Sequence, residues 1–584
     1  MLTRLRIKNF KRFDYADVDL GQNVILIGPN NSGKTSALQA LALWDLAVRR
    51  WHEKRSGKTM PKKKTGVALN RRDLLSLPVP EAKLLWHDLR VRDVTRPDGS
   101  PKVKNLRIRI DVEGVVDGDA WSCGMEFDYS NTESLYCRPC DSEDERPPVP
   151  SGAMESRIAY LPPMSGLVAN ELRLDPGAIQ VRIGEGRTAE VLRNLCYGLH
   201  ESASSNGWLE LVRRTRELFG VELSAPAYVP ERGELTMTYR ENDNTLDLSA
   251  SGRGLQQTVL LLAYMLGNPG AVLLLDEPDA HLEILRQRQI YDVLTSVARS
   301  TSSQIIAASH SEVLLNEAAD RDVVVAFVGP PHRIDDRGSQ VAKALKSIGF
   351  EHYVQAELVR WVLYLEGSTD LAILRAFAAI LEHPARSDLE RPYVHYVGNQ
   401  RSKAREHFFG LREACPNLLG LVITDPAGER YRQGKDDPLV SYQWRMNEIE
   451  NYLCFPEALE SYAARLAHDK AAGPLFQDSL RDRFVETMRD AIAQRVPPAA
   501  LKDRDDDWWR TIKATDQLLD PLFKSFFERL ELPHLMRKSD YHELAALVPR
   551  ARIDPEVSGV LDAIVQIATR VQPTASGLGE GAAG

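Results

Sequence analysis

The sequence predicts an α/β protein of at least two domains that ends in a mostly helical region. Short, strongly apolar runs at 272–275, 304–308 and 362–365 are each followed by polar or acidic residues, as at the carboxyl ends of buried parallel strands. A helical pattern at 371–382 follows the last of these runs, and helical patterns dominate beyond about residue 456. The chain has 584 residues, which is too long for one ordinary hydrophobic core.

The composition is that of an ordinary soluble globular protein, with 43% hydrophobic and 27% charged residues. No run of about 18 apolar residues is present, so we expect no membrane span. The first residues, MLTRLRIKNFKRF, are charged where a signal peptide needs an apolar stretch, which predicts a cytoplasmic protein. The six cysteines fit a reducing compartment. We expect Cys137 and Cys140 to be two unpaired thiols in a Pro-rich loop rather than zinc ligands, because no second pair lies nearby.

The net charge of −8 gives no overall attraction to nucleic acid. Residues 49–72 are nonetheless densely basic. Such a run is typical of a solvated loop, and contact with nucleic-acid phosphates is the alternative.

A glycine-rich loop between a predicted strand at 24–27 and a predicted helix at 35–43 carries the clearest chemical signal. Its sequence, Gly28-Pro-Asn-Asn-Ser-Gly-Lys-Thr35, fits the phosphate-loop pattern G-x-x-x-x-G-K-[ST]. The glycines let backbone N–H groups approach phosphates, Lys34 offers a cation to the β- and γ-phosphates, and the Thr35 hydroxyl is a ligand for Mg²⁺. We therefore predict an ATP site formed by Gly28, Asn30, Asn31, Ser32, Gly33, Lys34, Thr35 and Ser36.

Two further polar segments follow buried strands. The run VLLLDEPDAHL at 272–282 delivers Asp276 to hold Mg²⁺, directly or through water, and Glu277 to polarise the attacking water. His310, which ends the run IIAASH, is a candidate sensor of the γ-phosphate. The alternatives are an exposed acidic turn and a structural histidine.

The segment LSASGRGLQQ at 248–257 resembles the signature motif of ABC-type ATPases. The resemblance covers roughly residues 1–345, with a polar and basic insertion at about 45–155, and it implies the ABC-type fold. It also implies that Ser251 and Gly252, at a helix N-terminus, contact the γ-phosphate held by an opposite copy of the chain. We therefore expect a homo-oligomer built on head-to-tail dimers.

The basic segment NFKRF near the start resembles the Rad50 and SMC branch of this family, in which a basic residue lies near the nucleotide. Lys11 or Arg12 is the candidate here. Asp279 and His281 follow the second acidic motif, and the resemblance implies that they lie at the dimer seam. No long heptad segment is present, so the long coiled coil of SMC and Rad50 proteins is not expected.

Two carboxylates in the second half of the chain also follow buried strands. Glu366 follows the apolar run 362–365, and Asp425 ends the run LLGLVITD. Carboxylates at the ends of neighbouring strands suit a divalent cation. The alternative is that Glu366 and Asp370 only cap the following helix.

This region, 355–460, resembles the Toprim fold of topoisomerases, primases and the OLD-family (overcoming lysogenization defect) nucleases. The resemblance implies that Glu366 acts as an acid–base group or metal ligand and that Asp425 binds Mg²⁺, with Mn²⁺ as a second suitable metal. Glu448 or Glu450 is a candidate for a further carboxylate ligand.

One departure from that family concerns the metal ligands. The family's Asp-x-Asp reads Asp425-Pro-Ala427 here, so the second carboxylate is missing. Three explanations stay open: Glu450 or Glu429 replaces it, the metal is held weakly, or the chain carries an inactivating substitution. Lys538 is either a basic residue near the scissile phosphate or an ordinary surface lysine.

An ABC-type ATPase followed by a Toprim domain is the layout of OLD-family ATP-dependent nucleases, many of which serve in bacterial defence against phage, and it resembles fused PARIS-like systems. The resemblance implies an ATP-gated nuclease that acts on nucleic acid, with a phage-encoded trigger or a partner effector. The alternative is an ATP-driven sensor or scaffold whose degenerate Toprim domain does not cut. A helical region at 461–573 and, from its composition, a disordered tail at 574–584 complete the chain.

Overall fold

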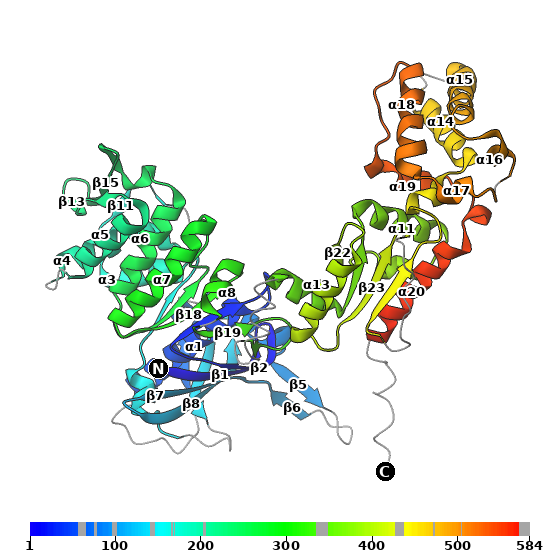
Figure 1. The fold of residues 1–584 in the computed structure, drawn as a ribbon. Coiled ribbons are helices and arrows are strands. Elements are labelled where there is room, and N and C mark those ends of the chain that lie inside the picture. The colour runs from blue at the N-terminus through cyan, green and yellow to red at the C-terminus, as the bar shows by residue number, and fades with distance from the viewer. Residues whose placement is uncertain are drawn as a thin grey trace, which may run out of the picture. The chain divides into compact units, whose positions relative to one another are not determined.

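The computed structural model of the protein describes residues 1–55, 66–74, 77, 79–95, 102–140, 147–164, 167–168, 170–202, 206–319, 321–334, 348–426, 437–470, 474–503 and 505–571. The chain forms two compact units, Met1–Lys346 (unit 1) and Ser347–Gly584 (unit 2). Both units combine strands and helices, so the predicted α/β class is confirmed (Figure 1).

The first sheet of unit 1 is antiparallel, with the strand order β2-β1-β7-β8-β9-β4. Its strands are β1 (Leu2–Phe10), β2 (Phe13–Asp19), β4 (Val67–Asn70), β7 (Ile108–Val116), β8 (Asp119–Asn131) and β9 (Ser134–Cys140). Alternate residues of β7, such as Ile108, Ile110 and Val112, are buried, so one face of this sheet is available for a core. A separate hairpin consists of β5 (Arg92–Thr95) and β6 (Lys102–Asn105).

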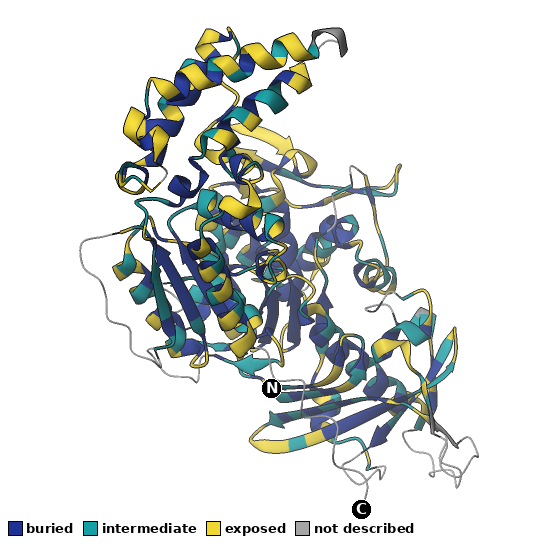
Figure 2. Ribbon diagram, turned by 90° about the vertical axis from the view of Figure 1, so that its right-hand side faces the viewer, coloured by how far each residue is buried: buried dark blue, intermediate teal, exposed yellow. Residues whose placement is uncertain are grey.

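The second sheet of unit 1 has the order β10-β17-β18-β3-β19-β20 and is parallel except for β20. Its strands are β3 (Asn23–Ile27), β10 (Ile158–Leu161), β17 (Val272–Asp276), β18 (Gln304–Ser309), β19 (Val323–Ala326) and β20 (His332–Arg333). Every residue of β17 and β18 is buried. Figure 2 shows buried residues of the chain in dark blue. Helix α1 (Lys34–Arg55) contacts both sheets and shares one hydrophobic core with them. The carboxyl ends of β17, β18 and β3 therefore form one edge beside the start of α1.

The rest of unit 1 is a group of helices with two small sheets. The helices are α2 (Ser151–Glu155), α3 (Pro176–Gly184), α4 (Leu192–Glu201), α5 (Asn206–Phe219), α6 (Arg253–Leu266), α7 (Ile284–Ser300) and α8 (Glu312–Ala318). One small sheet holds β11 (Glu171–Leu172), β14 (Glu234–Thr236) and β13 (Ala227–Val229), and the other holds β12 (Glu222–Leu223), β15 (Thr238–Glu241) and β16 (Asn244–Asp247). Helix α6 is buried along most of its length because α4, α5 and α7 pack around it.

Unit 2 is built on a parallel sheet with the order β22-β21-β23-β24. Its strands are β21 (Trp361–Leu365), β22 (Val394–Tyr396), β23 (Leu419–Thr424) and β24 (Leu439–Gln443). Leu363 and Leu365 pack into a core with α11 (Ser368–Ile380), α12 (Ala385–Asp388) and α20 (Pro555–Val571). The alternate residue Tyr364 instead faces the side of α10 (Phe350–Val359) and α13 (Arg401–Ala414), where its hydroxyl bonds to His407. Helices therefore cover both faces of this sheet.

The C-terminal part of unit 2 is mostly helical, as predicted. It contains α14 (Pro456–Lys470), α15 (Pro474–Ala493), α16 (Pro498–Lys502), α17 (Trp508–Thr511), α18 (Asp520–Arg529) and α19 (His542–Ala545) before α20. One hydrophobic core runs from β21 through these helices and includes Phe377, Phe523 and Ile564. The segments predicted as a Toprim-like domain and a helical region thus pack around a shared core.

The location predicted for the two CxxC cysteines is wrong. Cys137 and Cys140 lie in β9 rather than in a loop, and both are buried free thiols. The intervening Pro139 suggested a loop, because proline lacks the N–H group of a sheet ladder. It is tolerated because β4 pairs with β9 only over Ser134–Cys137, so Pro139 has a neighbouring strand on one side.

Several predictions fall outside the described residues. They concern positions 56–65 of the basic stretch, Ala427, Glu429 and the tail at 574–584. Within the described part of the chain, no helix is both long enough and apolar enough to cross a membrane.

Candidate ATP and metal sites

The phosphate loop lies between β3 and α1, at the edge where the parallel strands of unit 1 end. A Cβ atom on Gly28 would lie 2.8 Å from the carbonyl oxygen of Phe327, and one on Gly33 would lie 2.7 Å from the ring of Phe13. Gly33 has a φ of 109° and Asn31 a φ of 61°, left-handed conformations that turn the chain into the helix. Such a loop at a helix N-terminus presents backbone N–H groups to an anion.

Lys34 folds back onto the loop that precedes it. Its Nζ donates hydrogen bonds of 2.7 Å to the Gly28 carbonyl and 2.9 Å to the Pro29 carbonyl. Burial lowers the pKa of Lys34, and the charges of Glu277 and Asp276 oppose that shift. A buried ammonium bonded to neutral carbonyls gains by exchanging them for phosphate oxygens, because charge-assisted hydrogen bonds are stronger.

Asp276 ends β17 and meets the first turn of α1. The Thr35 hydroxyl donates a 3.1 Å hydrogen bond to Asp276 Oδ1, and the Tyr160 hydroxyl donates one of 3.3 Å to Oδ2. Burial raises the pKa of Asp276 from 3.8 to about 6, and the charge of Glu277 adds to that rise. A hydroxyl and a carboxylate side by side are the oxygen ligands that Mg²⁺ prefers, so these residues fit the ion of an Mg²⁺–ATP complex.

Glu277 and His310 face each other at the same edge. His310 Nδ1 lies 3.7 Å from Glu277 Oε1, and both side chains are partly exposed. Glu277 has a φ of 51°, a left-handed conformation that costs energy for a residue with a side chain and that clusters at functional sites. Its N–H group donates a 2.9 Å hydrogen bond to the Ala308 carbonyl, which fixes this turn against β18. The arrangement offers a partly exposed carboxylate to a water molecule.

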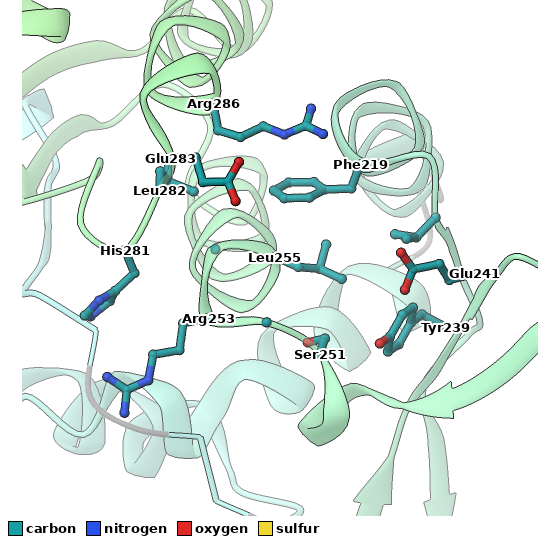
Figure 3. A pocket seen from close by; sticks show the side chains of 13 residues that line it. Phe219, Tyr239, Glu241, Ser251, Arg253, Leu255, His281, Leu282, Glu283 and Arg286 are labelled. Carbon is teal, nitrogen blue, oxygen red and sulfur yellow. The ribbon is translucent and has the colours of Figure 1, made fainter.

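The predicted signature residues lie at the start of α6. Gly252 is the N-cap residue, and Ser251 is buried with its hydroxyl donating to the Leu248 carbonyl at 2.7 Å. Both line an open cavity of about 410 Å³ together with His281 (Figure 3). Among the described residues that line this cavity, none belongs to the phosphate loop at 28–35. Gly252 is exposed, and Ser251 lines the same cavity, on a side of the unit that its own phosphate loop does not line.

Asp279 and His281, the other residues predicted at a dimer seam, lie in the turn between β17 and α7. Asp279 is buried; burial raises its pKa, and a hydrogen bond from Ser309 opposes the rise. His281 has a φ of 64°, is exposed and lies at the rim of the same cavity as Ser251 and Gly252. The buried Asp279 therefore stabilises the turn through its hydrogen bond with Ser309, whereas His281 lies on the exposed side of the turn.

Lys11 and Arg12 lie in the turn between β1 and β2. Lys11 donates a hydrogen bond to the side chain of Gln39 in α1, and burial lowers the pKa of Lys11 to about 8. Arg12 lies beside the phosphate loop, since a Cβ atom on Gly33 would be 3.6 Å from Arg12 Cδ. Arg12 is the better placed of the two candidates to reach a bound nucleotide.

Unit 2 brings four carboxylates to the carboxyl end of its sheet, which we call the acidic group: Glu366, Asp370, Asp425 and Glu450. Glu366 follows β21, and Asp425 follows β23, the strand paired with β21. Asp370, in the first turn of α11, accepts a 3.1 Å hydrogen bond from the Glu366 N–H group. Glu450 is buried in the 3₁₀ helix Ile449–Leu453. Asp370 therefore both caps the start of α11 and contributes charge to this group.

The carboxylates of the acidic group repel one another in a partly buried place. Burial, followed by the charge of Glu366, raises the pKa of Asp425 from 3.8 to about 8. Burial, followed by the charges of Glu450 and Glu366, raises the pKa of Asp370 to about 7. A divalent cation would relieve this repulsion, so the chemistry of the donors fits Mg²⁺ or Mn²⁺.

The acidic group is looser than a closed coordination shell. No three of its members have carboxylate oxygens that all lie within 4.8 Å of one another. Glu448, the alternative to Glu450, accepts a 3.0 Å hydrogen bond from the Thr515 N–H group and so serves the local fold. An ion held here would need water or phosphate oxygens to complete its coordination. Ala427 and Glu429, which bear on the missing acid, lie outside the described residues.

Two residues from distant parts of the chain contact the acidic group. Lys538 Nζ lies 3.5 Å from Glu450 Oε1, so Lys538 is at the candidate site. The side-chain oxygen of Asn399, a residue with a φ of 56°, accepts a 3.1 Å hydrogen bond from the Asp425 N–H group.

Sequence reasoning missed Tyr160 and Asn399. Tyr160 belongs to the short apolar strand β10, and Asn399 to the loop before α13. A polar side chain near the end of an apolar run was the one signal available for Tyr160, and a left-handed asparagine in a loop is invisible in the sequence.

Comparison with known proteins supports an ATPase in unit 1. Residues 1–48 match a family model described as "AAA ATPase domain", and residues 204–316 match one described as "AAA domain, putative AbiEii toxin, Type IV TA system". The chain is 23% identical over 382 residues to "OLD nuclease" of Thermus scotoductus (strain ATCC 700910 / SA-01). That match covers 56% of this chain and 64% of the relative, so the chain spans less than two thirds of the relative's length.

Solved SMC head domains are similar over 57% of this chain. One, the SmcHead bound to the C-winged helix domain of ScpA, is covered to 97% with 15% identity and a TM-score of 0.34. Another, the SMC head domain from Thermotoga maritima, is covered to 98% with 14% identity and a TM-score of 0.30.

The geometry of unit 1 and the sequence matches point the same way. The phosphate loop and the start of α1 lie within the first matched region, and the signature segment, Asp276 and His310 lie within the second. The chain is therefore similar in sequence to an OLD nuclease, and its N-terminal unit carries the parts of an ATPase that the two AAA family models match.

Proposed function

We propose that the protein is an ATP-dependent nuclease of the OLD type that acts on nucleic acid in bacterial defence against phage. In this proposal, ATP-driven pairing of two copies through unit 1 controls cleavage by unit 2. The observation that carries it is the acidic group, whose four carboxylates repel one another at one edge of the sheet and raise the pKa values of Asp425 and Asp370. The same chain also holds a candidate ATP site. A phage-encoded trigger or a partner effector would set the timing of cleavage.

In the ATP site, Lys34 and the backbone of the phosphate loop bind the phosphates, and Thr35 and Asp276 hold Mg²⁺. Glu277 orients and deprotonates the attacking water, and its fixed turn against β18 keeps the carboxylate in place. His310, 3.7 Å from Glu277, responds to charge at the γ-phosphate.

Pairing follows from the accessible signature face. Ser251 and Gly252 immediately precede α6, where free N–H groups and the helix dipole favour an anion. The γ-phosphate held by a second copy would supply that anion. ATP therefore acts as part of the dimer interface, and its hydrolysis releases the pair.

In unit 2, Glu366 and Asp425 hold the divalent metal, with Glu450 as the further carboxylate. Mg²⁺ or Mn²⁺ bound there supplies the positive charge that polarises a phosphodiester and lowers the pKa of water. Lys538, beside Glu450, is placed to offer its ammonium group to a phosphate oxygen. Asn399 fixes the backbone at Asp425 through its 3.1 Å hydrogen bond.

The second candidate function is an ATP-driven sensor or scaffold in which unit 2 binds a partner without cutting. Two observations favour it. Ala427 stands where the related nucleases have an acid, and the carboxylates of the acidic group are loosely spaced.

The deciding experiment compares the wild-type chain with the variants Glu366→Ala and Ala427→Asp. Each is incubated with plasmid, linear DNA and tRNA, with ATP and with Mg²⁺ or Mn²⁺. The nuclease proposal expects cleavage that Glu366→Ala abolishes and that Ala427→Asp increases. The nuclease proposal fails if none of the three proteins cuts any substrate, ATP hydrolysis is intact and unit 2 binds no metal. The sensor or scaffold function would then replace the nuclease function.

A further inference from the structure

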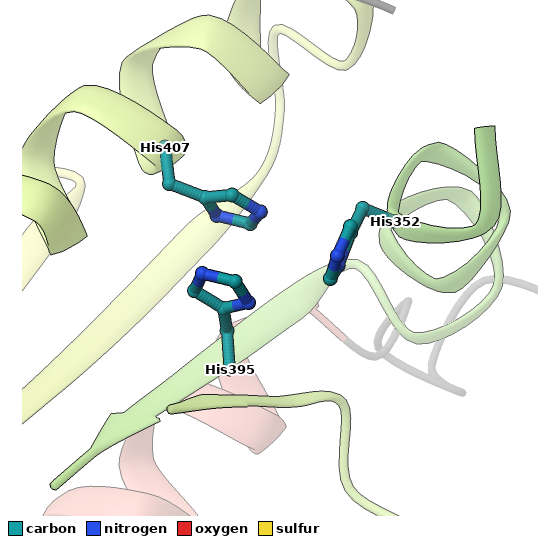
Figure 4. A group of neighbouring side chains, drawn as sticks. All are labelled: His352, His395 and His407. Carbon is teal, nitrogen blue, oxygen red and sulfur yellow. The ribbon is translucent and has the colours of Figure 1, made fainter. Parts of the chain in front are cut away.

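Three histidines from three elements of unit 2 meet on the face of the sheet that α10 and α13 cover. His352 comes from α10, His395 from β22 and His407 from α13 (Figure 4). Each offers one ring nitrogen, and these three atoms all lie within 4.8 Å of one another. Among the described residues, no other three or more histidine, cysteine or acidic side chains converge this closely.

Two tyrosines orient the rings. The hydroxyl of Tyr364 lies 2.9 Å from His407 Nδ1, and that of Tyr393 lies 3.0 Å from His352 Nδ1. When each tyrosine oxygen accepts the Nδ1–H, the Nε2 lone pair of the same ring remains available. Histidines that bind metals commonly have this arrangement, with the second ring nitrogen bonded to an oxygen.

The remaining nitrogen of His407 needs a partner. His407 Nε2 is buried and makes no hydrogen bond, and a buried polar atom in that state costs free energy. The ring of His407 stacks on that of His395, with centroids 3.8 Å apart and planes 7° apart. The ring of His352 stands nearly perpendicular to both, at 4.9 Å from each. The lone pair of Nε2 lies in the plane of the ring, so a ligand at the edge of the His407 ring would satisfy the unpaired nitrogen.

The surroundings favour the neutral form of two of the rings, those of His407 and His395. Burial, followed by the charges of His395 and His352, lowers the pKa of His407 to about 3. Burial, followed by the charge of His352, also lowers the pKa of His395. Neutral imidazole is the form that coordinates a metal, whereas an anion would need protonated rings.

We propose that His352, His395 and His407 form a binding site for a divalent transition-metal ion, best matched by Zn²⁺, with water as the fourth ligand. Three imidazole nitrogens with one open position suit Zn²⁺, and the all-oxygen acidic group suits Mg²⁺ or Mn²⁺ instead. Zn–N distances of about 2.0 Å, with the ion near the plane of each ring, require the stacked rings of His395 and His407 to tilt relative to each other on binding. The ion would tie α10 to β22 and α13. This site is independent of the proposed nuclease function.

The test uses the untagged full-length chain, loaded with Zn²⁺, desalted and analysed for metal per chain. The wild type should keep about one Zn²⁺ more than His395→Ala and than His407→Gln, and Zn²⁺ should raise its Tm more than theirs. His468→Ala is the matched control, because His468 is an exposed histidine of unit 2 and lies in α14. Glu366→Ala should retain this ion, which separates the histidine site from the acidic group.

Replacement with Co²⁺ gives a second readout. The wild type and His468→Ala should show the intense visible absorption of four-coordinate Co²⁺, and His395→Ala should lose it. Because His395 is only partly buried, this variant decides the matter even where His407→Gln fails to fold. A wild type that keeps no Zn²⁺, or a His395→Ala chain that keeps as much as the wild type, overturns the proposal.

Discussion

The Thr35 hydroxyl donates a 3.1 Å hydrogen bond to Asp276 Oδ1, so the phosphate loop and the end of β17 are joined directly. The two residues come from elements far apart in the sequence, and the parallel register of β17, β18 and β3 brings them to one edge. Burial of Asp276 at this edge makes its ionisation depend on what binds there.

Binding of Mg²⁺–ATP should weaken below neutral pH. The pKa of Asp276 is raised from 3.8 to about 6, so this carboxyl is protonated below that pH and must lose its proton to bind the metal. Apparent affinity should fall roughly tenfold per pH unit below about pH 6 for one proton released. Titration with a fluorescent ATP analogue from pH 5 to 8 measures it. Asp276→Asn should bind weakly with a flat profile, and a flat wild-type profile would refute the assignment.

Replacing Lys34 should abolish nucleotide binding, whereas replacing Glu277 should slow ATP hydrolysis. Lys34→Ala removes the cation that binds the phosphates, so nucleotide binding should be lost. Glu277→Gln keeps the phosphate loop but removes the base, so ATP should bind and be turned over about 100-fold or more slowly. Filter binding and phosphate release measure the two effects. Lys8→Ala, an exposed position in β1, is the control, and equal loss of binding in both variants would show that the roles are wrong.

ATP should drive dimerisation through the signature residues. A Cβ atom on Gly252 would meet no atom within 4 Å, and Gly252 has a φ of −63°, so Gly252→Asp is tolerated by the fold. Its negative charge would oppose the γ-phosphate of a second copy. In light scattering, Glu277→Gln with ATP should form dimers that the added Gly252→Asp prevents, while ATP binding persists.

Gly177→Asp is the matched control for that experiment, because Gly177 in α3 also has open space around its Cα. It should leave both dimerisation and ATP binding unchanged. Full ATPase activity in a chain that stays monomeric at every concentration would rule the pairing out.

The candidate ATP site could be predicted from the sequence because each of its motifs is one short contiguous segment. Lys34, Asp276 and His310 each follow a short apolar strand, and the fixed polarity of parallel strands takes all three to one edge. Tyr160 could not be predicted, since its bond to Asp276 spans 116 positions and depends on β10 pairing with β17. A hydroxyl contact of this kind has no sequence pattern.

The site in unit 2 was only partly predictable for a similar reason. Glu366 and Asp425 end apolar runs, and the sequence indicates them. Lys538 lies in a polar segment after α18, and only the packing of the helical region against the sheet brings it to Glu450. The three histidines are far apart in sequence and share no motif, so their convergence is a property of the tertiary fold.

Removing the lysine beside Glu450 should destabilise unit 2. Lys538→Met leaves the Glu450 carboxylate buried without its cation, which should lower the free energy of unfolding by about 1 kcal/mol, a modest value because Lys538 is half exposed. Chemical denaturation in metal-free buffer measures it. The double variant Lys538→Met/Glu450→Gln should recover the loss, and Lys524→Met, exposed in α18, should be neutral. Additive losses in the double variant would contradict the pairing.

The acidic group should bind metal more tightly as pH rises. In the metal-free protein, the pKa of Asp425 is raised from 3.8 to about 8 and that of Asp370 to about 7. Because these folded-state pKa values exceed the unfolded ones, both groups favour the folded state at low pH, and that contribution is lost as pH rises from about 4 to 8. A divalent ion binds the ionised carboxylates. It should therefore restore the most stability at high pH, where ionisation of these buried groups destabilises the folded state.

Thermal unfolding with and without Mn²⁺ between pH 6 and 9 tests this coupling. The rise in Tm caused by Mn²⁺ should grow toward pH 8, with apparent affinity increasing up to roughly tenfold per pH unit for each proton released. Asp425→Asn, which cannot ionise, should be more stable than the wild type at pH 8 without metal and should gain much less from Mn²⁺. Asp482→Asn, exposed on α15, should behave as the wild type. An Mn²⁺ effect that is independent of pH, or equal in Asp425→Asn, would mean that the ion binds elsewhere, and the metal-dependent role of the acidic group would then fail.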